Sequence, residues 1–67
     1  MKLWEYVGKR VEIITTDNDT IRAFVNAYED DTANDEGVDS IDYTKLDDIS
    51  HTPYVIFENE IKSIKVI

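Results

Sequence analysis

The chain has 67 residues, no cysteine and one histidine, and its formal net charge is −8 because 15 acidic residues oppose seven basic ones. A chain of this length forms one small domain, so we expect residues 1–67 to fold as a single unit that gains stability by self-association. Disulfides and thiolate metal sites are excluded. No segment is apolar for long enough to span a bilayer, and MKLWEYVGKR lacks the apolar core of a signal peptide. We therefore expect a cytoplasmic protein that does not contact membranes.

The negative charge is concentrated in one segment. Acidic and basic residues cancel in residues 1–28 and again in residues 52–67. Residues 29–51 hold nine acidic residues against Lys45 alone, and we call this segment the acidic excursion. It suggests either a surface that docks a basic partner or one that discourages nonspecific binding of nucleic acid.

The first predicted element is a helix of one or two turns. Leu3, Trp4 and Val7 have helical spacing, and Gly8 is suited to end the helix because it readily adopts a positive φ. Residues 9–16 then alternate as a strand whose buried face carries Val11 and Ile13. We expect the helix to lay Trp4 over one end of the core.

The next two predicted strands are separated by the acidic loop. Asn18–Asp19 suits a tight hairpin turn into the long strand 20–29. Apolar side chains occupy both faces of that strand, with Phe24 and Tyr28 on the face opposite Val25, so we expect it to bend. A third strand covers residues 38–44 and places Ile41 and Tyr43 on one face.

The last segment, YVIFENEIKSIKVI, predicts two strands joined by a tight corner. Its apolar residues lapse at residues 58–60, and the step from Ile61 to Ile64 is three residues, which a regular strand does not allow. A single 3₁₀ turn supplies that step. Taken together, the elements predict a mainly β fold: a five-stranded, strongly bent antiparallel barrel with a short N-terminal helix and a 3₁₀ turn before the last strand. A helix-rich alternative is disfavoured because β-branched and aromatic residues dominate the apolar positions.

Three stretches resemble the Sm-like (LSm) family, and in particular its small bacterial members. YVGKRVEII is similar to the family's opening helix, glycine and first strand. TDNDTIRAFVNAY resembles its first motif, and YVIFENEIKSIKVI resembles its second motif, in which strand four, a 3₁₀ turn and strand five follow one another. Other barrels of the Src-homology-3 type share this ending and are the alternative at the level of the fold.

The resemblance implies ring formation, because family members pair strand four of one subunit with strand five of the next. YVIF carries apolar side chains on both of its faces, more than the interior of a small barrel requires. The residues that we assign to this interface with a second copy or a partner are Tyr54, Ile56, Lys65 and Ile67.

The resemblance also implies RNA binding near a central pore, with contacts from Tyr28, Asn34 and Asn59. Three features depart from the family pattern. Ala23 replaces a glycine, the loop after Tyr28 is longer and more acidic, and Glu58–Asn59 replaces the Arg-Gly pair whose arginine contacts nucleic acid. A glutamate at that position repels phosphate, and seven scattered bases make a poor electrostatic footprint for nucleic acid.

Neither a metal site nor a catalytic site is indicated. If Gly37 is set at the sixth position of a calcium-binding EF-hand loop, Thr32 falls first and Tyr43 twelfth, so the required ligands are missing. No nucleophile motif accompanies His51, and no glycine-rich phosphate loop is present. The sequence therefore predicts a non-catalytic, cofactor-free module for assembly or protein interaction. The alternative is an Sm-like RNA-binding protein or RNA chaperone.

Overall fold

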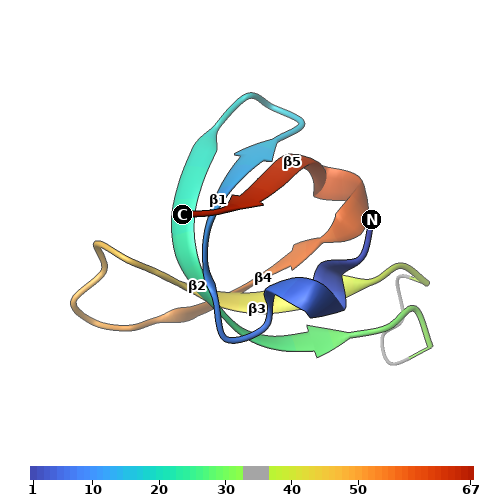
Figure 1. The fold of residues 1–67 in the computed structure, drawn as a ribbon, viewed down its shortest axis with the longest axis horizontal. Helices are drawn as coiled ribbons and strands as arrows, with labels where there is room; N and C mark the ends of the chain where they lie inside the picture. The colour runs from blue at the N-terminus through green and yellow to red at the C-terminus, as the bar shows by residue number, and fades with distance from the viewer. Residues whose placement is uncertain (33–36) are drawn as a thin grey trace.

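The computed structural model describes residues 1–32 and 37–67. Five strands and two 3₁₀ turns follow one another along the chain (Figure 1). In chain order they are η1 (Leu3–Tyr6), β1 (Arg10–Thr15), β2 (Thr20–Glu29), β3 (Ser40–Lys45), β4 (Pro53–Phe57), η2 (Glu58–Glu60) and β5 (Ile61–Val66). The predicted element order is confirmed, and the N-terminal helix is a single 3₁₀ turn. The predicted contact residue Asn34 lies outside the described residues.

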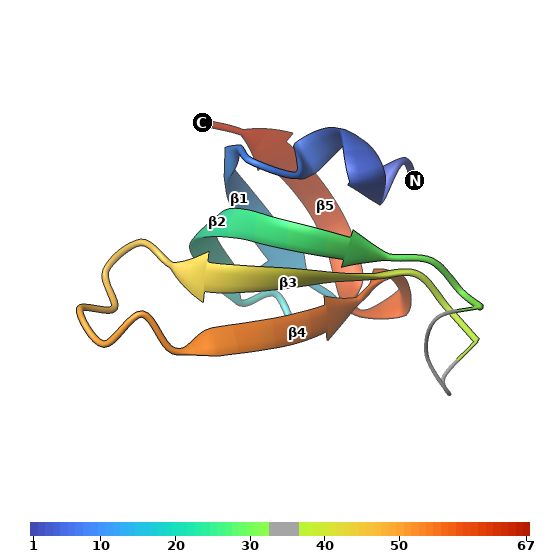
Figure 2. The ribbon, with the colours of Figure 1, turned by 90° about the horizontal axis from the view of Figure 1, so that it is seen from below.

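The strands form one antiparallel sheet in the order β4-β3-β2-β1-β5. Each strand pairs with its neighbour in this order, and among the described residues β4 and β5 do not pair with each other. Figure 2 shows the consequence, with β3 and β4 below and β1 and β5 crossing behind them. The mainly β, five-stranded sheet is confirmed. The sheet is open, so it has two edges.

The β1–β2 hairpin forms where its turn residues predict it. Asn18 has a φ of 67°, a left-handed conformation that asparagine tolerates better than most residues. The amide of Asn18 donates to the carbonyl of Thr15 at 2.9 Å, and the amide of Thr15 donates to the carbonyl of Asp19 at the same distance. The hairpin places Val11 opposite Ala23 and Ile13 opposite Ile21.

The long strand β2 bends at a bulge. Its pairing register with β3 shifts between Val25 and Ala27, so Asn26 is the extra residue. A bulge interrupts the alternation of faces, and Tyr28 accordingly packs against the core instead of lying beside Phe24. The predicted bend is confirmed, but the predicted face of Tyr28 is wrong because simple alternation takes no account of a bulge.

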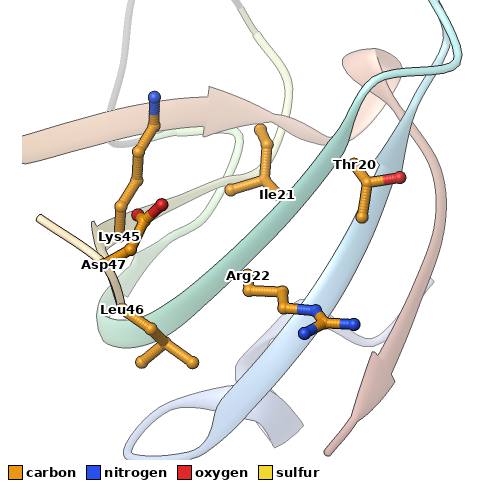
Figure 3. A pocket seen from close by; sticks show the side chains of 6 residues that line it. All are labelled: Thr20, Ile21, Arg22, Lys45, Leu46 and Asp47. Carbon is orange, nitrogen blue, oxygen red and sulfur yellow. The ribbon is translucent and has the colours of Figure 1, made fainter.

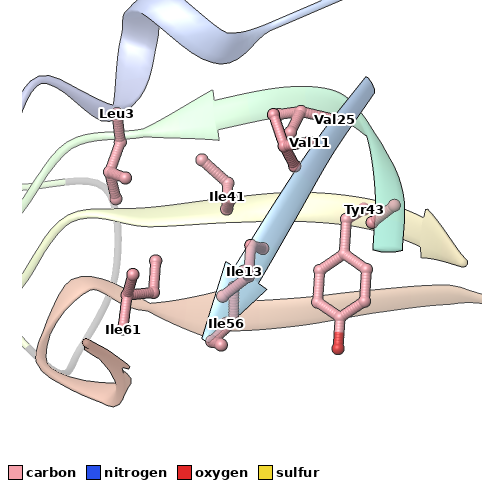
Figure 4. Packing of buried hydrophobic residues seen from close by; sticks show 9 residues of the cluster. Leu3, Val11, Ile13, Val25, Ile41, Tyr43, Ile56 and Ile61 are labelled. Carbon is pink, nitrogen blue, oxygen red and sulfur yellow. The ribbon is translucent and has the colours of Figure 1, made fainter. Parts of the chain in front are cut away.

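The core is built from the concave side of the bent sheet and is covered at one end by η1 (Figure 4). Its buried residues are Leu3, Val11, Ile13, Ala23, Val25, Ile41, Tyr43, Ile56 and Ile61. Leu3 is completely buried, whereas Trp4 is 52% exposed. The prediction that Trp4 covers the core is therefore wrong: a single 3₁₀ turn directs only one of these side chains inward, and that residue is Leu3.

The corner between β4 and β5 is stabilised by the polar residues that interrupt the apolar pattern. The Glu60 carboxylate accepts a hydrogen bond from the Phe57 amide at 3.1 Å, and the Ile61 amide donates to the Glu58 carbonyl, which closes the turn. Ile61 then enters the core. The predicted 3₁₀ turn before the last strand is confirmed. The three-residue step from Ile61 to Ile64 lies inside β5 instead, where the register with β1 shifts between Ile14 and Thr15 and leaves Lys62 as an extra residue. Among the described residues no helix has the length and apolar character needed to cross a membrane.

Candidate functional site

The outer edge of β4 offers both backbone groups and apolar side chains. The Glu58 amide donates to the Asp39 carbonyl at 2.8 Å, which sets the alternation of the β3–β4 ladder. In an antiparallel ladder every second residue bonds to its neighbour. Tyr54 and Ile56 therefore bond to β3, and the amide and carbonyl of Val55 point outward. The Val55 side chain is 56% exposed.

The outer edge of β5 has the same construction. The Ile67 amide donates to the Arg10 carbonyl at 3.0 Å, so Lys65 and Ser63 bond to β1. The amides and carbonyls of Ile64 and Val66 consequently point outward. Val66 and Ile67 are both about half exposed, at 54% and 51%. Both edges can therefore accept a further strand and cover apolar surface as they do so.

The four predicted interface residues do not all face outward. Ile56 lies opposite Ile41 and is only 5% exposed, because paired residues share a face of the sheet and Ile41 is in the core. Its side chain is therefore unavailable to a partner. Tyr54 and Ile67 are partly exposed, so their assignment to an interface stays a prediction. The sequence reasoning missed Val55, which alternation counted from Ile56 places on the outer face. It also missed Val66, which shares the face of Val11 but is 54% exposed.

Lys65 belongs to a row of charges on the convex face of the sheet. Glu12 lies between Arg22 and Lys65 in the strand register. Its carboxylate is 3.3 Å from Arg22 Nε and 3.5 Å from Lys65 Nζ. The Lys65 ammonium is therefore paired within its own chain, and its side chain reaches toward β1 rather than beyond the β5 edge.

The end of the core opposite η1 is formed by two stacked tyrosines. The rings of Tyr43 and Tyr54 are 5.5 Å apart and inclined by 20°, and the Lys45 ammonium lies 4.8 Å from the Tyr54 ring centre. Burial, followed by the neighbouring Tyr54 and Glu60, raises the pKa of the Tyr43 hydroxyl. This end is closed by the buried Tyr43 ring and the partly exposed Tyr54 ring.

Tyr28, one of the residues predicted to contact RNA, lies among carboxylates. The Tyr28 hydroxyl donates to Asp39 Oδ2 at 2.9 Å, and Trp4 packs edge-on against the Tyr28 ring with 5.9 Å between centroids. Burial, then the hydrogen bond to Asp39, then the charges of Asp39, Asp30 and Asp31 raise the pKa of Tyr28 to about 12. Both the ring and the hydroxyl of Tyr28 already have partners within the chain.

Asn59 is exposed in η2, between Glu58 and Glu60. Glu58 Oε1 lies 3.1 Å from the amino group of Met1, so one of these two carboxylates has a positive neighbour. The backbone contact between Glu58 and Asp39 joins η2 to the region of Tyr28. We call this region the acidic end; it consists of Glu29, Asp30, Asp31, Asp39, Glu58 and Glu60. An incoming phosphate would meet negative charge from three elements.

Two shallow grooves lie at the opposite end, and they share Lys45 and Leu46. The first, of about 610 Å³, is lined by Thr20, Ile21, Arg22, Lys45, Leu46 and Asp47 (Figure 3). In Figure 3 the Lys45 and Arg22 side chains point away from each other, so they do not converge on one anion. The second, of about 400 Å³, is lined by Phe24, Asn26, Thr44, Lys45, Leu46 and His51. Asn26 Nδ2 donates to Thr44 Oγ1 at 2.8 Å on its polar side.

The loop beside these grooves, residues 46–52, is organised by Asp48. Its carboxylate accepts hydrogen bonds from the Ser50 hydroxyl at 2.5 Å and the Ser50 amide at 2.9 Å, and these bonds lower the pKa of Asp48. His51 follows with a φ of 54°, which turns the chain back toward β4. Within residues 1–32 and 37–67, no group of three or more histidine, cysteine or carboxylate side chains is arranged to bind a metal ion.

Comparison with family models, with curated proteins and with solved structures gives no match to this chain.

Proposed function

We propose that this chain is a non-catalytic Sm-like module that associates with copies of itself by pairing the β4 edge of one copy with the β5 edge of the next. The observation that carries the proposal is the presence of two unpaired edges in a single small sheet, each with outward backbone groups and exposed apolar side chains. The Sm-like barrel, completed by a neighbour rather than closed within one chain, is part of the proposal. So is a cytoplasmic location.

Pairing between the edges is supported by the backbone hydrogen-bonding groups that each edge presents. Val55 on β4 presents an amide and a carbonyl, and Ile64 and Val66 on β5 present the complementary groups two residues apart. An added strand satisfies these groups and covers the Val55 and Val66 side chains. Because β4 and β5 are different surfaces, the contact is heterologous and generates a ring or an open chain of subunits.

Substitution of an outward amide tests this contact. Val55→Pro removes an N–H that β3 does not use, and edge strands tolerate proline at such positions. The matched control, Val55→Thr, keeps both the amide and the β-branched side chain. Light scattering at micromolar concentration should show a multiple of the chain mass for the wild type and the control, and a smaller mass for Val55→Pro. A clean wild-type monomer without association would remove the proposal.

RNA binding is the alternative function, and the geometry of the acidic end argues against it. Oligo-U and oligo-A titrated at low salt provide the test, since electrostatic attraction is strongest there. We expect no binding at high protein concentration. Saturable binding that weakens as salt rises would favour the RNA-binding function.

The acidic excursion is proposed to serve a basic protein partner or to keep nucleic acid away. The test is a variant in which four of its acidic residues are replaced together by neutral ones: Asp30, Asp31, Asp35 and Glu36. If capture of a basic partner is unchanged in that variant, the docking role is wrong. If the variant gains RNA binding that the wild type lacks, the excluding role is supported.

A further inference from the structure

We infer that the chain has a second surface for self-association, separate from the sheet edges, in which Ile49 of one copy inserts into the Phe24–Leu46 groove of another. The occupant is a second copy of this chain, and the contact is two-fold. Three features of the 46–52 end support this inference: a protruding apolar side chain, a groove that accepts one, and a local mixture of positive and negative charges.

The protruding side chain is Ile49. It is 95% exposed, the highest value among the exposed large apolar residues. Neither groove includes Ile49 in its lining, so within one chain this side chain does not occupy the space beside it. The loop that carries it is not loose, because Asp48 accepts hydrogen bonds from Ser50 and the His51 amide donates to the Asp48 carbonyl at 3.2 Å. An isoleucine is therefore presented to solvent by a loop with defined internal contacts.

The groove lies next to this loop and has the chemistry of an apolar side-chain pocket. Its apolar lining comes from the ring of Phe24 and the methyl groups of Leu46. Both residues are more than one third exposed. The hydrogen bond between Asn26 and Thr44 leaves the polar side satisfied. Its volume of about 400 Å³ readily holds one branched aliphatic side chain. Leu46 and Ile49 lie three residues apart, so a protrusion and a pocket occur side by side on one surface.

A surface that carries both a protrusion and its pocket is self-complementary about a two-fold axis. Such an isologous contact is made twice, with the isoleucine of each copy in the groove of the other. A partner of unrelated chemistry would use the groove but leave Ile49 uncovered. A second copy covers both at once.

The distribution of charge also favours a second copy as the occupant, bound through loop 46–52. In a chain of net charge −8, two copies repel each other through most of their surface. At this end Lys45 and Arg22 lie beside Asp47, and Arg22 also pairs with Glu12, so positive and negative charges are mixed, unlike the run of carboxylates at the acidic end. The molecule is 31 Å long, and Figures 1 and 2 both show loop 46–52 at the end opposite the acidic end. A contact through loop 46–52 therefore keeps the two acidic ends far beyond the screening distance of about 8 Å at physiological salt.

The test combines Ile49→Asp with the edge variant Val55→Pro, measured by sedimentation velocity over a range of protein concentrations. Val55→Pro alone should leave a dimer, and the double variant should be monomeric, with association weakened roughly tenfold or more. Ile49→Leu is the matched control and should retain the dimer. Ile49 has no core contact, so circular dichroism should show the same fold for each variant.

Cross-linking gives a second measurement that does not depend on the strength of association. The natural chain has no cysteine, so Leu46→Cys and Ile49→Cys chains can be mixed and oxidised. We expect the mixed disulfide between the two chains to form faster than either symmetric disulfide.

The outcomes separate the two contacts. Loss of the dimer on Ile49→Asp, with no larger species in the wild type, supports the loop contact and removes the edge contact. An unchanged mass distribution for Ile49→Asp, or a monomeric Val55→Pro variant, overturns the loop contact and leaves the edge contact standing. A wild type that stays monomeric at all concentrations overturns both.

Discussion

The core of this small sheet is covered in different ways at its two ends. At the acidic end, Leu3 of η1 is completely buried in the core, and Tyr28 donates a hydrogen bond to Asp39. At the other end, the core finishes in the stacked rings of Tyr43 and Tyr54, and loop 46–52 is held by local bonds around Asp48. The first end is stabilised by burial and long-range contacts, and the second mainly by short-range ones. The comparison teaches that a small core can be covered at one end by a local turn while the surface at its other end keeps exposed apolar side chains.

The largest effect on stability should follow truncation of Leu3, the residue of η1 that covers the core. Leu3→Ala deletes most of a side chain that has no exposed surface, so we expect the free energy of unfolding to fall by about 2–5 kcal/mol. Trp4→Ala, one residue away, should lose less than about 1.5 kcal/mol because its ring meets the protein mainly through its edge contact with Tyr28. Urea denaturation of both variants measures the difference. A larger loss for Trp4→Ala would contradict our assignment of Leu3 as the covering residue.

A smaller effect is expected at the opposite end of the core. Tyr54→Ala removes the stack on Tyr43 and the ring beneath Lys45, together about 1–2 kcal/mol. Tyr54→Phe keeps the ring and should be close to the wild type. Denaturation should be followed at a concentration where the wild type is monomeric. Equal losses for the two variants would show that the hydroxyl group, not the ring, closes this end.

At the acidic end the expected change is in the pKa of Tyr28. Its pKa of about 12 in the folded chain lies above the ordinary value of 10.0, so its contribution to stability is complete below pH 10.0 and is lost as the pH rises toward 12. Asp39→Ala removes both the acceptor of this hydrogen bond and its charge, the second and third causes of the shift, and should move the pKa toward 10.0. Asp31→Asn removes only the weakest cause and should move it much less. Phenolate absorbance as a function of pH measures both, and equal shifts would contradict the hydrogen bond.

The smallest effect should occur in loop 46–52. Ser50→Ala deletes the hydroxyl donor to Asp48, so the pKa of Asp48 should rise toward its ordinary value of 3.8 without a change in the global unfolding midpoint. Because the folded pKa is lowered, the stability that it lends to the loop is present above pH 3.8 and is lost below it. Carboxyl titration by NMR gives the pKa, with Ser63→Ala on β5 as the control. A fall in global stability would show that the loop is part of the core.

Much of the fold could be predicted because local patterns determine it. Alternation placed Val11, Ile13, Ile41 and Tyr43 in the core, and the break in the apolar pattern at residues 58–60 coincides with η2. The position of Tyr28 could not be predicted in this way, since a bulge depends on pairing with a second strand and leaves no periodic signal. The prediction for Trp4 was wrong for a similar reason. Helical spacing does not distinguish a 3₁₀ turn from an α-helix over four residues.

The candidate edges were predictable as strands but not in detail. Which backbone groups point outward depends on the ladder set by Glu58 with Asp39 and by Ile67 with Arg10, and these contacts join residues distant in sequence. Ile56 was assigned to the interface because it is apolar, although its pairing with Ile41 directs it to the core. The protrusion of Ile49 was not predicted, because one apolar residue in a polar loop carries no pattern.

The bulge at Asn26 has a consequence for the size of any assembly built from the two edges. It bends β2, the central strand of the sheet, and so helps to set the angle between β4 at one edge and β5 at the other. When identical subunits join head to tail, this angle is the rotation from each subunit to the next, and closure requires that the rotations add up to one full circle. One extra residue in the middle of a strand thereby influences how many subunits complete the circle, or whether they instead wind into an endless fibre.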